Sequence, residues 1–150
     1  MKNSSKHKKN QKMTLEKLIV VSGKPGIFKI NNQTKAGLLV EELIGNKKFP
    51  IQNMHNVSGL NDIAIYTYED EVPLREVFKK IHVKEAGKAT ISHKESKNTL
   101  IDFFTEILPN YDTERVYPSN IKKIVQWYNL LVDAKFDFTT MDKKESSEEE

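Results

Sequence analysis

The sequence predicts an α+β protein, with a small curled β-barrel at the N-terminus and a three-helix part after it. Two observations support this fold class. Up to about residue 70, short apolar runs alternate with turn residues, and from residue 73 onward apolar residues recur at the spacing of three and four that is typical of helices. Strands followed by helices are the order of an α+β fold. We therefore expect a β-barrel domain over residues 13–70 and a helical domain over residues 71–138.

Five short strands are expected in the N-terminal domain, at spacings of roughly ten residues that suit a small barrel. Pro50 lies within the fourth run and places it at a sheet edge, because proline cannot donate a ladder hydrogen bond. The fifth run is rich in β-branched and aromatic residues, which favour strands, and the stretch VSGLNDI before it is expected to be a turn. The runs are LIVV (18–21), IFKI (27–30), LLVEEL (38–43), FPI (49–51) and IAIYTY (63–68), and the polar turn NNQTKAG separates the second from the third.

Three helices are expected in the C-terminal domain. The first begins after Pro73, which the first turn of a helix tolerates, and ends at Gly87. Ser92 and Glu95 form the expected capping box of the second helix, and Ser119 is the expected cap of the third. The third helix carries one wide apolar stripe, made of Ile121, Ile124, Val125, Tyr128, Leu131 and Val132.

The stretch VSGKPGIFKI (21–30) contains the one glycine-rich turn that invites comparison with a phosphate-binding loop. Such a loop places four residues between its first glycine and a Gly-Lys pair, and a helix follows it. Here Gly23 and Gly26 are three positions apart, an apolar strand follows, and Pro25 removes one backbone amide. We therefore interpret the turn as a structural corner in which the glycines supply positive φ angles.

Catalytic and metal chemistry find little support in the sequence. The chain has no cysteine, so disulfides, thiolate metal sites and thiol nucleophiles are excluded. The histidines have no metal-ligand spacing, and no arrangement of nucleophile and base is discernible. We expect a protein that is not an enzyme and holds no cofactor and no metal. No run approaches the roughly 18 apolar residues of a membrane helix, and we expect a cytoplasmic protein. The histidines are His7, His55, His82 and His93.

The net charge of +3 is distributed unevenly along the chain. Residues 1–12 carry five lysines and no acid, residues 139–150 carry two lysines and five acids, and the part between them is nearly neutral at +1. Segments with few apolar residues cannot bury enough surface to fold. We therefore expect disordered tails, a basic one at 1–12 and an acidic one at 139–150.

The segment YDTERVYPSNIKKIVQWYNLL (111–131) interleaves aromatic and basic residues. Such a pattern can stack nucleic-acid bases and hold phosphates. It can equally close a small core, with the hydroxyl and indole groups at the rim, and we favour that interpretation because three helices need large side chains to bury. The residues concerned are Tyr111, Tyr117, Trp127 and Tyr128, together with Arg115, Lys122 and Lys123.

Several blocks of the sequence resemble a family of short proteins from Bacteroidetes that are classified as domains of unknown function. The blocks are MTLEKLIVVSGKPGIFKI, QTKAGLLVEEL, KKFPI, IAIYTYEDEVPLREVFKKI and YDTERVYPSNIKKIVQWYNLL, and they span residues 13–133. The resemblance implies a small N-terminal β-domain and a C-terminal helical domain. It implies no activity.

The predicted barrel is similar to SH3-like modules, many of which bind RNA, ribosomal surfaces or peptides; this is an analogy of fold alone. Residues 14–52 hold six lysines against three acids, which favours binding to phosphates. Our hypothesis is a non-enzymatic accessory protein that binds structured RNA or the ribosome, and the alternative is a protein–protein adaptor. The expected RNA contacts are Lys24, Lys29, Lys35, Lys47, Lys48, Lys122 and Lys123, aided by Lys2, Lys6, Lys8, Lys9 and Lys12 of the tail.

Overall fold

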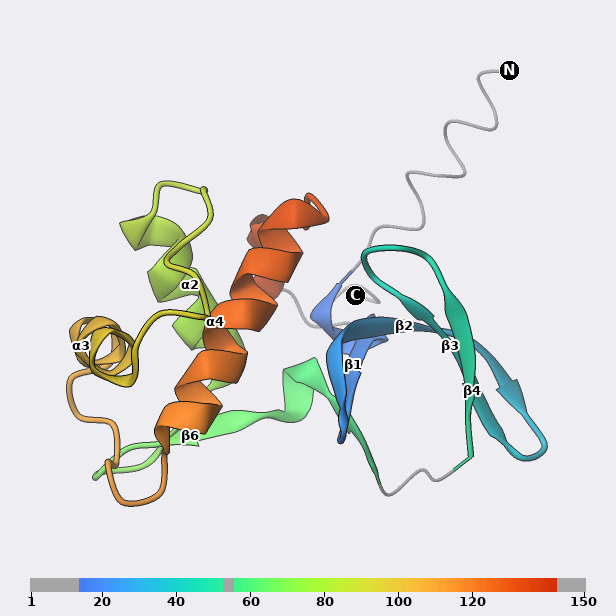
Figure 1. Ribbon diagram of the computed structural model, residues 1–150, viewed down its shortest axis with the longest axis horizontal. Helices are drawn as coiled ribbons and strands as arrows, with labels where there is room; N and C mark the ends of the chain where they lie inside the picture. Colours follow the sequence, from blue (N-terminus) through green and yellow to red (C-terminus); the bar gives the residue numbers. More distant parts are fainter. Residues whose placement is uncertain (1–13, 53–55, 143–150) are drawn as a thin grey trace, which may run out of the picture.

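The computed structural model describes residues 14–52 and 56–142, and in them the chain has an N-terminal antiparallel sheet followed by three α-helices. The α+β class is confirmed. Figure 1 shows the sheet on the right and the helices on the left, with α4 between the sheet and the other two helices. The helices are α2 (Leu74–Lys84), α3 (Lys97–Ile107) and α4 (Pro118–Asp133), and the short 3-10 helices are η1 (Leu15–Lys17), η3 (Leu60–Asp62) and η4 (Phe138–Asp142).

The main sheet has five antiparallel strands in the order β4-β3-β2-β1-β5. Pro50 lies in β4, at one end of this order, so the predicted edge position is confirmed. The two end strands, β4 and β5, are not paired with each other in the described residues, so the sheet is open there and its closure into a barrel stays a prediction. The strands are β1 (Leu18–Val21), β2 (Lys24–Thr34), β3 (Gly37–Glu42), β4 (Lys48–Ile51) and β5 (Val57–Gly59).

The fifth strand of this sheet is not the one that the sequence predicts. The run 63–68 forms β6 (Ala64–Tyr66), which pairs with β7 (Glu71–Pro73) in a separate two-stranded sheet. The place beside β1 is taken by β5, a part of the stretch that we expected to be a turn. Strand propensity identifies an extended segment but not its partner. The run 63–68 therefore lies with the helical part. Thr67 also forms an isolated antiparallel β-bridge with Tyr111, which follows α3.

Strand β2 is longer than predicted. It continues through most of the polar stretch that we expected to be a turn, because Asn32, Gln33 and Thr34 pair with β3. The register shifts between Ile30 and Asn32, where the ladder is irregular. The turn itself is confined to residues 35 and 36, and the end of this hairpin projects from the rest of the sheet (Figure 1).

The start of α3 differs from the prediction by four residues. Ser96 is the N-cap, and its Oγ accepts a hydrogen bond of 3.2 Å from the backbone N–H of Thr99. Ser92 instead accepts from the N–H of Lys94 in a turn ahead of the helix. Both serines satisfy the sequence pattern of a cap, and only the local backbone path decides between them.

The start of α4 also differs. The N-cap is Tyr117 and Pro118 is the first helical residue, so Ser119 lies inside the first turn. Proline suits this position because its missing N–H has no partner within a helix. The side chain of Asn120 accepts a hydrogen bond of 2.8 Å from the N–H of Tyr117 and closes the turn.

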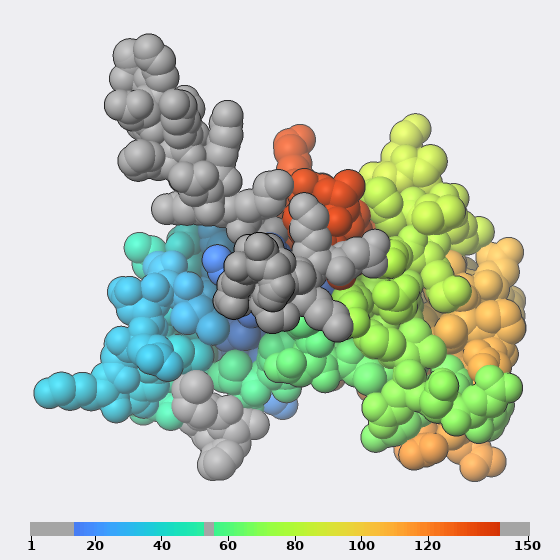
Figure 2. All heavy atoms as spheres, turned by 180° about the vertical axis from the view of Figure 1, so that it is seen from behind, coloured from blue at the N-terminus to red at the C-terminus, as the bar shows by residue number. Residues whose placement is uncertain are grey.

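The core extends across both parts of the chain. Leu18, Ile27 and Leu43 of the sheet region belong to the same buried cluster as the inner faces of α2, α3 and α4. A second, smaller cluster covers the opposite face of the sheet and contains Ile19, Val21, Phe28, Leu38, Val40 and Ile51. Because side chains alternate along a strand, β1 and β2 contribute to both clusters. Figure 2 shows the sheet residues in blue and cyan and the helical residues in green to orange as two adjoining masses.

Residues 139–142, which we expected to belong to the acidic tail, are part of η4. Thr140 and Met141 are each only 3% exposed, and η4 packs against α2 through the ring of Phe138, which stacks on His82 at 4.3 Å. A buried methionine adds to the core in a stretch that composition alone marks as polar. The predicted tails at 1–12 and 143–150 lie outside the described residues.

The buried face of α4 leads to a first prediction. Leu131 is 0% exposed in the main core cluster, so Leu131→Ala is expected to lower the free energy of unfolding by about 2–5 kcal/mol. Lys122 is exposed on the same helix, and Lys122→Ala is the matched control that should leave stability nearly unchanged. Chemical denaturation of both variants measures this. Equal effects would mean that α4 faces the other way.

Two glycines lead to a second prediction. Gly26 has φ +104° and a Cβ there meets nothing within 4 Å, so Gly26→Ala should cost only the backbone strain of about 1–2 kcal/mol. Gly37 has φ +156°, and a Cβ there would collide with the carbonyl oxygen of Ile51 in the neighbouring strand. Gly37→Ala should therefore be clearly the more destabilising of the two in thermal melts. A Gly37→Ala protein as stable as Gly26→Ala would contradict the pairing of β3 with β4.

Candidate nucleic-acid interface

A hollow of about 580 Å³ lies between the first hairpin of the sheet and helix α4. The corner between β1 and β2 forms one wall, β5 contributes a second, and the middle of α4 forms a third. The lining residues come from both parts of the chain and are of mixed character: polar, basic and aromatic residues together with the apolar Val20, Val21, Pro25 and Ile63. We call this hollow the corner cavity, and its main lining residues are Ser22, Lys24, Asn56, Lys123, Gln126 and Trp127.

The corner itself has the backbone that the sequence predicts. Gly23 and Gly26 have φ angles of +87° and +104°, and Val21 pairs with Lys24 across a two-residue turn. Strand β2 follows, so no helix N-terminus stands behind the glycines and the phosphate-loop interpretation has no support. The corner nevertheless lines a cavity. No motif in the sequence signals this, because the opposite wall is α4, which follows some 90 residues later.

The structure brings two of the predicted lysines into the corner cavity. Lys24 comes from the sheet and Lys123 from α4, and both line the hollow. Lys47 and Lys24 both lie over the ring of Phe49: the ammonium group of Lys24 is 4.7 Å from the ring centroid and that of Lys47 is 5.5 Å from it. Positive charge is therefore concentrated at the corner, where a cation over an aromatic face is also stabilised by the ring.

The other predicted lysines are more scattered. Lys29 and Lys48 are both register partners of Glu41, one on each side, so an acid stands between them on the same sheet face. Lys35 lies in the turn that ends the β2–β3 hairpin. Lys122 is exposed on α4, on the side of His93, whose pKa is lowered by burial and by the charges of Lys94 and Lys122. The lysines of residues 1–12 lie outside the described part.

The aromatic residues of the segment 111–131 divide between the two interpretations. Tyr111 and Tyr128 are 4% and 0% exposed and belong to the core, as we favoured. The hydroxyl of Tyr128 donates a hydrogen bond of 2.8 Å to the carbonyl of Lys88, and burial raises the pKa of Tyr128 to about 12, with a further contribution from Glu85. Tyr117 is exposed, and Trp127 is half-buried and lines the corner cavity.

A second, smaller hollow of about 160 Å³ adjoins the first, and we call it the arginine pocket. The two share Ile63, Lys123 and Trp127 in their walls. Its outer wall is a pair that the sequence did not predict, because the partners are far apart in the chain. The guanidinium carbon of Arg115 lies 4.2 Å from the ring centroid of Tyr66 on β6.

Asp112 holds this arginine in place. Its Oδ2 accepts a hydrogen bond of 3.0 Å from Nε of Arg115, and its Oδ1 accepts one of 2.9 Å from the N–H of Glu114. The backbone N–H of Glu114 and then the Arg115 guanidinium hold the pKa of Asp112 below its ordinary value of 3.8, against the opposing effect of burial. The ionised carboxylate is therefore the form that organises this loop.

Other kinds of site receive no support from the described residues. Within residues 14–52 and 56–142, no three histidine, aspartate or glutamate side chains converge in a way that could hold a metal ion. His7 and His55 fall outside these ranges. In the same ranges, no helix combines the length and apolar character that crossing a membrane requires.

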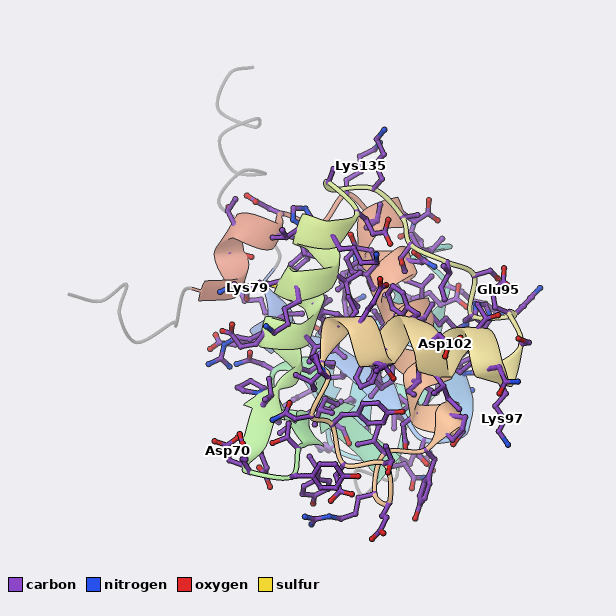
Figure 3. The ribbon with its side chains drawn as sticks, turned by 90° about the vertical axis from the view of Figure 1, so that its left-hand side faces the viewer. Asp70, Lys79, Glu95, Lys97, Asp102 and Lys135 are labelled. Carbon is purple, nitrogen blue, oxygen red and sulfur yellow. The ribbon has the colours of Figure 1, made fainter. Side chains whose placement is uncertain are left out.

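The outer face of α2 and α3 carries charges of both signs. Figure 3 shows Lys79, Lys97, Asp102 and Glu95 on this side of the molecule. Two ion pairs balance part of this charge: Lys79 with Glu76 at 3.5 Å, and Lys84 with Glu106 at 3.2 Å. Helices α2 and α3 together hold five lysines or arginines against three acids, so a net charge of +2 remains on them. Unlike the corner, the hollow on this face between α2 and α3 has no aromatic side chain among its lining residues.

Comparisons with known proteins match both parts of the chain. Two family models, each described as a domain of unknown function, cover residues 15–60 (DUF5606) and residues 63–131 (DUF6852). A solution NMR structure from Bacteroides vulgatus, determined by the Northeast Structural Genomics Consortium, is similar with 40% sequence identity and a TM-score of 0.69, over 83% of this chain and 91% of that chain. No curated protein matches. The two matched ranges meet at η3, where the chain leaves the five-stranded sheet.

The loop of Asp112 leads to a third prediction, on pH. A carboxyl whose pKa is lowered by folding stabilises the folded state at pH values above its ordinary pKa, and this contribution is lost as the pH falls below about 4. Asp112→Asn should therefore lower stability at pH 7 and flatten the loss of stability in acid. Urea unfolding at a series of pH values measures both effects, with Asp102→Asn on the exposed face of α3 as control. A variant with the wild-type pH profile would contradict the assigned role of Asp112.

Proposed function

This chain belongs to the family of uncharacterised Bacteroidetes proteins that join a β-part to a helical part. From that premise we propose that it is a non-enzymatic accessory protein of the cytoplasm that binds RNA, either on the ribosome or on another structured RNA. The corner cavity is the central binding surface in this proposal. Lys24 and Lys123 contact phosphates there, and Lys47 extends the contact along the sheet.

The observation that carries the proposal is the composition of the corner cavity. Two lysines from distant parts of the chain and the half-buried Trp127 line one hollow. Proteins that bind single-stranded nucleic acid combine positive charge, which follows the phosphates, with aromatic side chains on which bases stack. Polar groups of Ser22, Asn56 and Gln126 complete the walls and can bond to base edges or sugar hydroxyls.

The finer fold assignment is part of this proposal. We propose that the five-stranded sheet is an SH3-like curled barrel, as the sequence led us to expect. In support, β1 lies between β2 and β5, and the long strand β2 has an irregular register after Ile30, where it can bend and take part in both halves of a barrel. The analogy with SH3-like folds supports an RNA or peptide partner as a class, and the site residues must identify the partner.

Charge supports the proposal without deciding it. Residues 14–52 carry a net charge of +3 and residues 1–12 carry +5. The lysines outside the corner cavity, Lys29, Lys35, Lys48 and Lys122, then serve as outer phosphate contacts, aided by the lysines of residues 1–12. Such contacts position an RNA and add affinity, but they read no sequence.

One observation favours a second candidate, the protein–protein adaptor. Strand β4 ends the sheet, and Ile44, in the turn that leads from β3 to β4, is 40% exposed. An edge strand can pair with a strand of another protein, and an apolar residue beside it would add specificity. This surface lies on the sheet alone and does not use α4.

Salt dependence gives a fourth prediction, which tests the RNA proposal. Each lysine contact to a single-stranded phosphate contributes roughly 0.7 to the slope of log affinity against log salt. Lys24→Ala with Lys123→Ala should therefore weaken RNA binding and reduce that slope by roughly 1.4. The matched control is Lys80→Ala with Lys97→Ala, two exposed lysines on α2 and α3. Titration of a labelled RNA at several salt concentrations measures both.

The adaptor predicts a different pattern. A partner that is captured from lysate after nuclease treatment and at high salt, and equally well by the Lys24→Ala/Lys123→Ala protein, would overturn the RNA proposal and favour a protein partner at the sheet edge. An RNA that binds both double variants with the same slope would place its binding surface away from the corner cavity.

A further inference from the structure

Arg115 is an exposed arginine that is held in one orientation. Its side chain is 58% exposed, yet its Nε bonds to Asp112 and its guanidinium lies on the ring of Tyr66. Within the described part of the chain, Nε is the one guanidinium nitrogen with a hydrogen bond. One side of the planar group therefore rests on the protein, and its amino groups remain open to a ligand.

The loop that carries Arg115 is anchored independently of the arginine. The N–H of Asp112 donates to the carbonyl of Tyr66 at 3.0 Å, and the N–H of Tyr68 donates to the carbonyl of Asn110 at 3.1 Å. The ring of Tyr111 is buried against Phe104 in the core. These contacts hold the loop independently of Arg115, while Asp112 and the ring of Tyr66 hold its guanidinium in the wall of the pocket.

The arginine pocket has the size and lining for one flat group. At about 160 Å³ it is well below the roughly 300–1,000 Å³ of sites that enclose a whole small ligand. Tyr66 and Arg115 line one part of it and Trp127 another, with Lys123 between the two hollows. A planar base can therefore enter the pocket while the phosphate of the same nucleotide stays within reach of Lys123.

We propose that the arginine pocket binds an unstacked nucleobase of a single-stranded RNA segment, and that Arg115 and Tyr66 are its stacking residues. This inference rests on the proposed function and identifies the form of RNA that the surface takes. Arginine planes and aromatic rings both stack bases that have left a helix. Bases within a duplex are already stacked and paired, so a duplex offers its phosphates and sugar hydroxyls but no free base for the arginine pocket.

The test uses the single tryptophan of the chain as the probe. Trp127 lines both hollows, so its fluorescence reports on occupation of either. The full chain is titrated with a single-stranded oligouridylate of about 12 nucleotides, within the range of known single-strand sites, and with a duplex RNA of the same length. We expect tighter binding of the single strand and a change of Trp127 fluorescence on saturation.

Two variants isolate the stacking residues. Tyr66→Leu keeps apolar bulk but removes the ring, and Arg115→Lys keeps the charge but removes the plane. Each should weaken binding of the single strand about 5-fold to 150-fold, the range for loss of one stacked base, with the salt slope unchanged. Arg75→Lys, at the other arginine of the chain, is the matched control and should bind as the wild type does. Melting curves check that each variant is folded. If Tyr66→Leu does not fold, the binding of Arg115→Lys alone tests the proposal.

The outcomes separate this inference from the proposed function. If Lys24→Ala with Lys123→Ala weakens binding while Arg115→Lys and Tyr66→Leu do not, the stacking proposal is overturned and the RNA proposal stands. Equal affinity for the duplex and the single strand would also overturn it. If no RNA binds the wild-type chain at all, both proposals fail together.

Discussion

The packing of one face of the sheet against the helices is the contact on which the rest of the structure depends. Leu18 and Val20 of β1 point to the helices, while Ile19 and Val21 point to the second cluster on the other face. This alternation buries β1 on both sides. Because β2 also contacts α4 directly, the helix is held opposite the corner between the two strands. The corner cavity is a consequence of this arrangement: it is the space that remains where a tight turn meets a helix across a shared core.

The structural and functional interpretations of the corner are therefore compatible. Gly23 and Gly26 are present because the turn needs positive φ angles, and a side chain at either position would meet open space. Their conformation has a structural cause. The position of the turn in the fold nevertheless makes it a wall of the cavity, with Lys24 among the lining residues. A glycine that is required for a positive φ angle can thus also be part of a binding surface.

Most of the fold could be predicted from the sequence, whereas the site could be predicted only in part. Alternation and helical spacing depend on nearby residues, so β1 and the stripe of α4 are found correctly. The pairing of strands depends on distant residues, and for that reason VSG joins the sheet while the more strand-like run 63–68 does not. The same limit applies to the site. The sequence predicts Lys24 and Lys123 only as two of seven lysine contacts, and it is the fold that brings these two to one cavity. The pair of Arg115 with Tyr66 joins two positions 49 residues apart.

The charge of the folded part constrains how RNA could be held. Between the two tails the net charge is only +1, so a non-specific attraction of the whole surface for phosphates is weak. Lys29 and Lys48 even share an acidic neighbour, Glu41. In our proposal, binding therefore depends on a local arrangement of cations beside aromatic faces at Phe49 and Tyr66, with Trp127 in the wall of both hollows. Stacking on such faces adds free energy that salt screens little, whereas phosphate contacts weaken as salt rises. A nearly neutral protein that binds RNA in this way would select unpaired segments by their exposed bases, and the phosphates would mainly fix the direction of the strand across the corner.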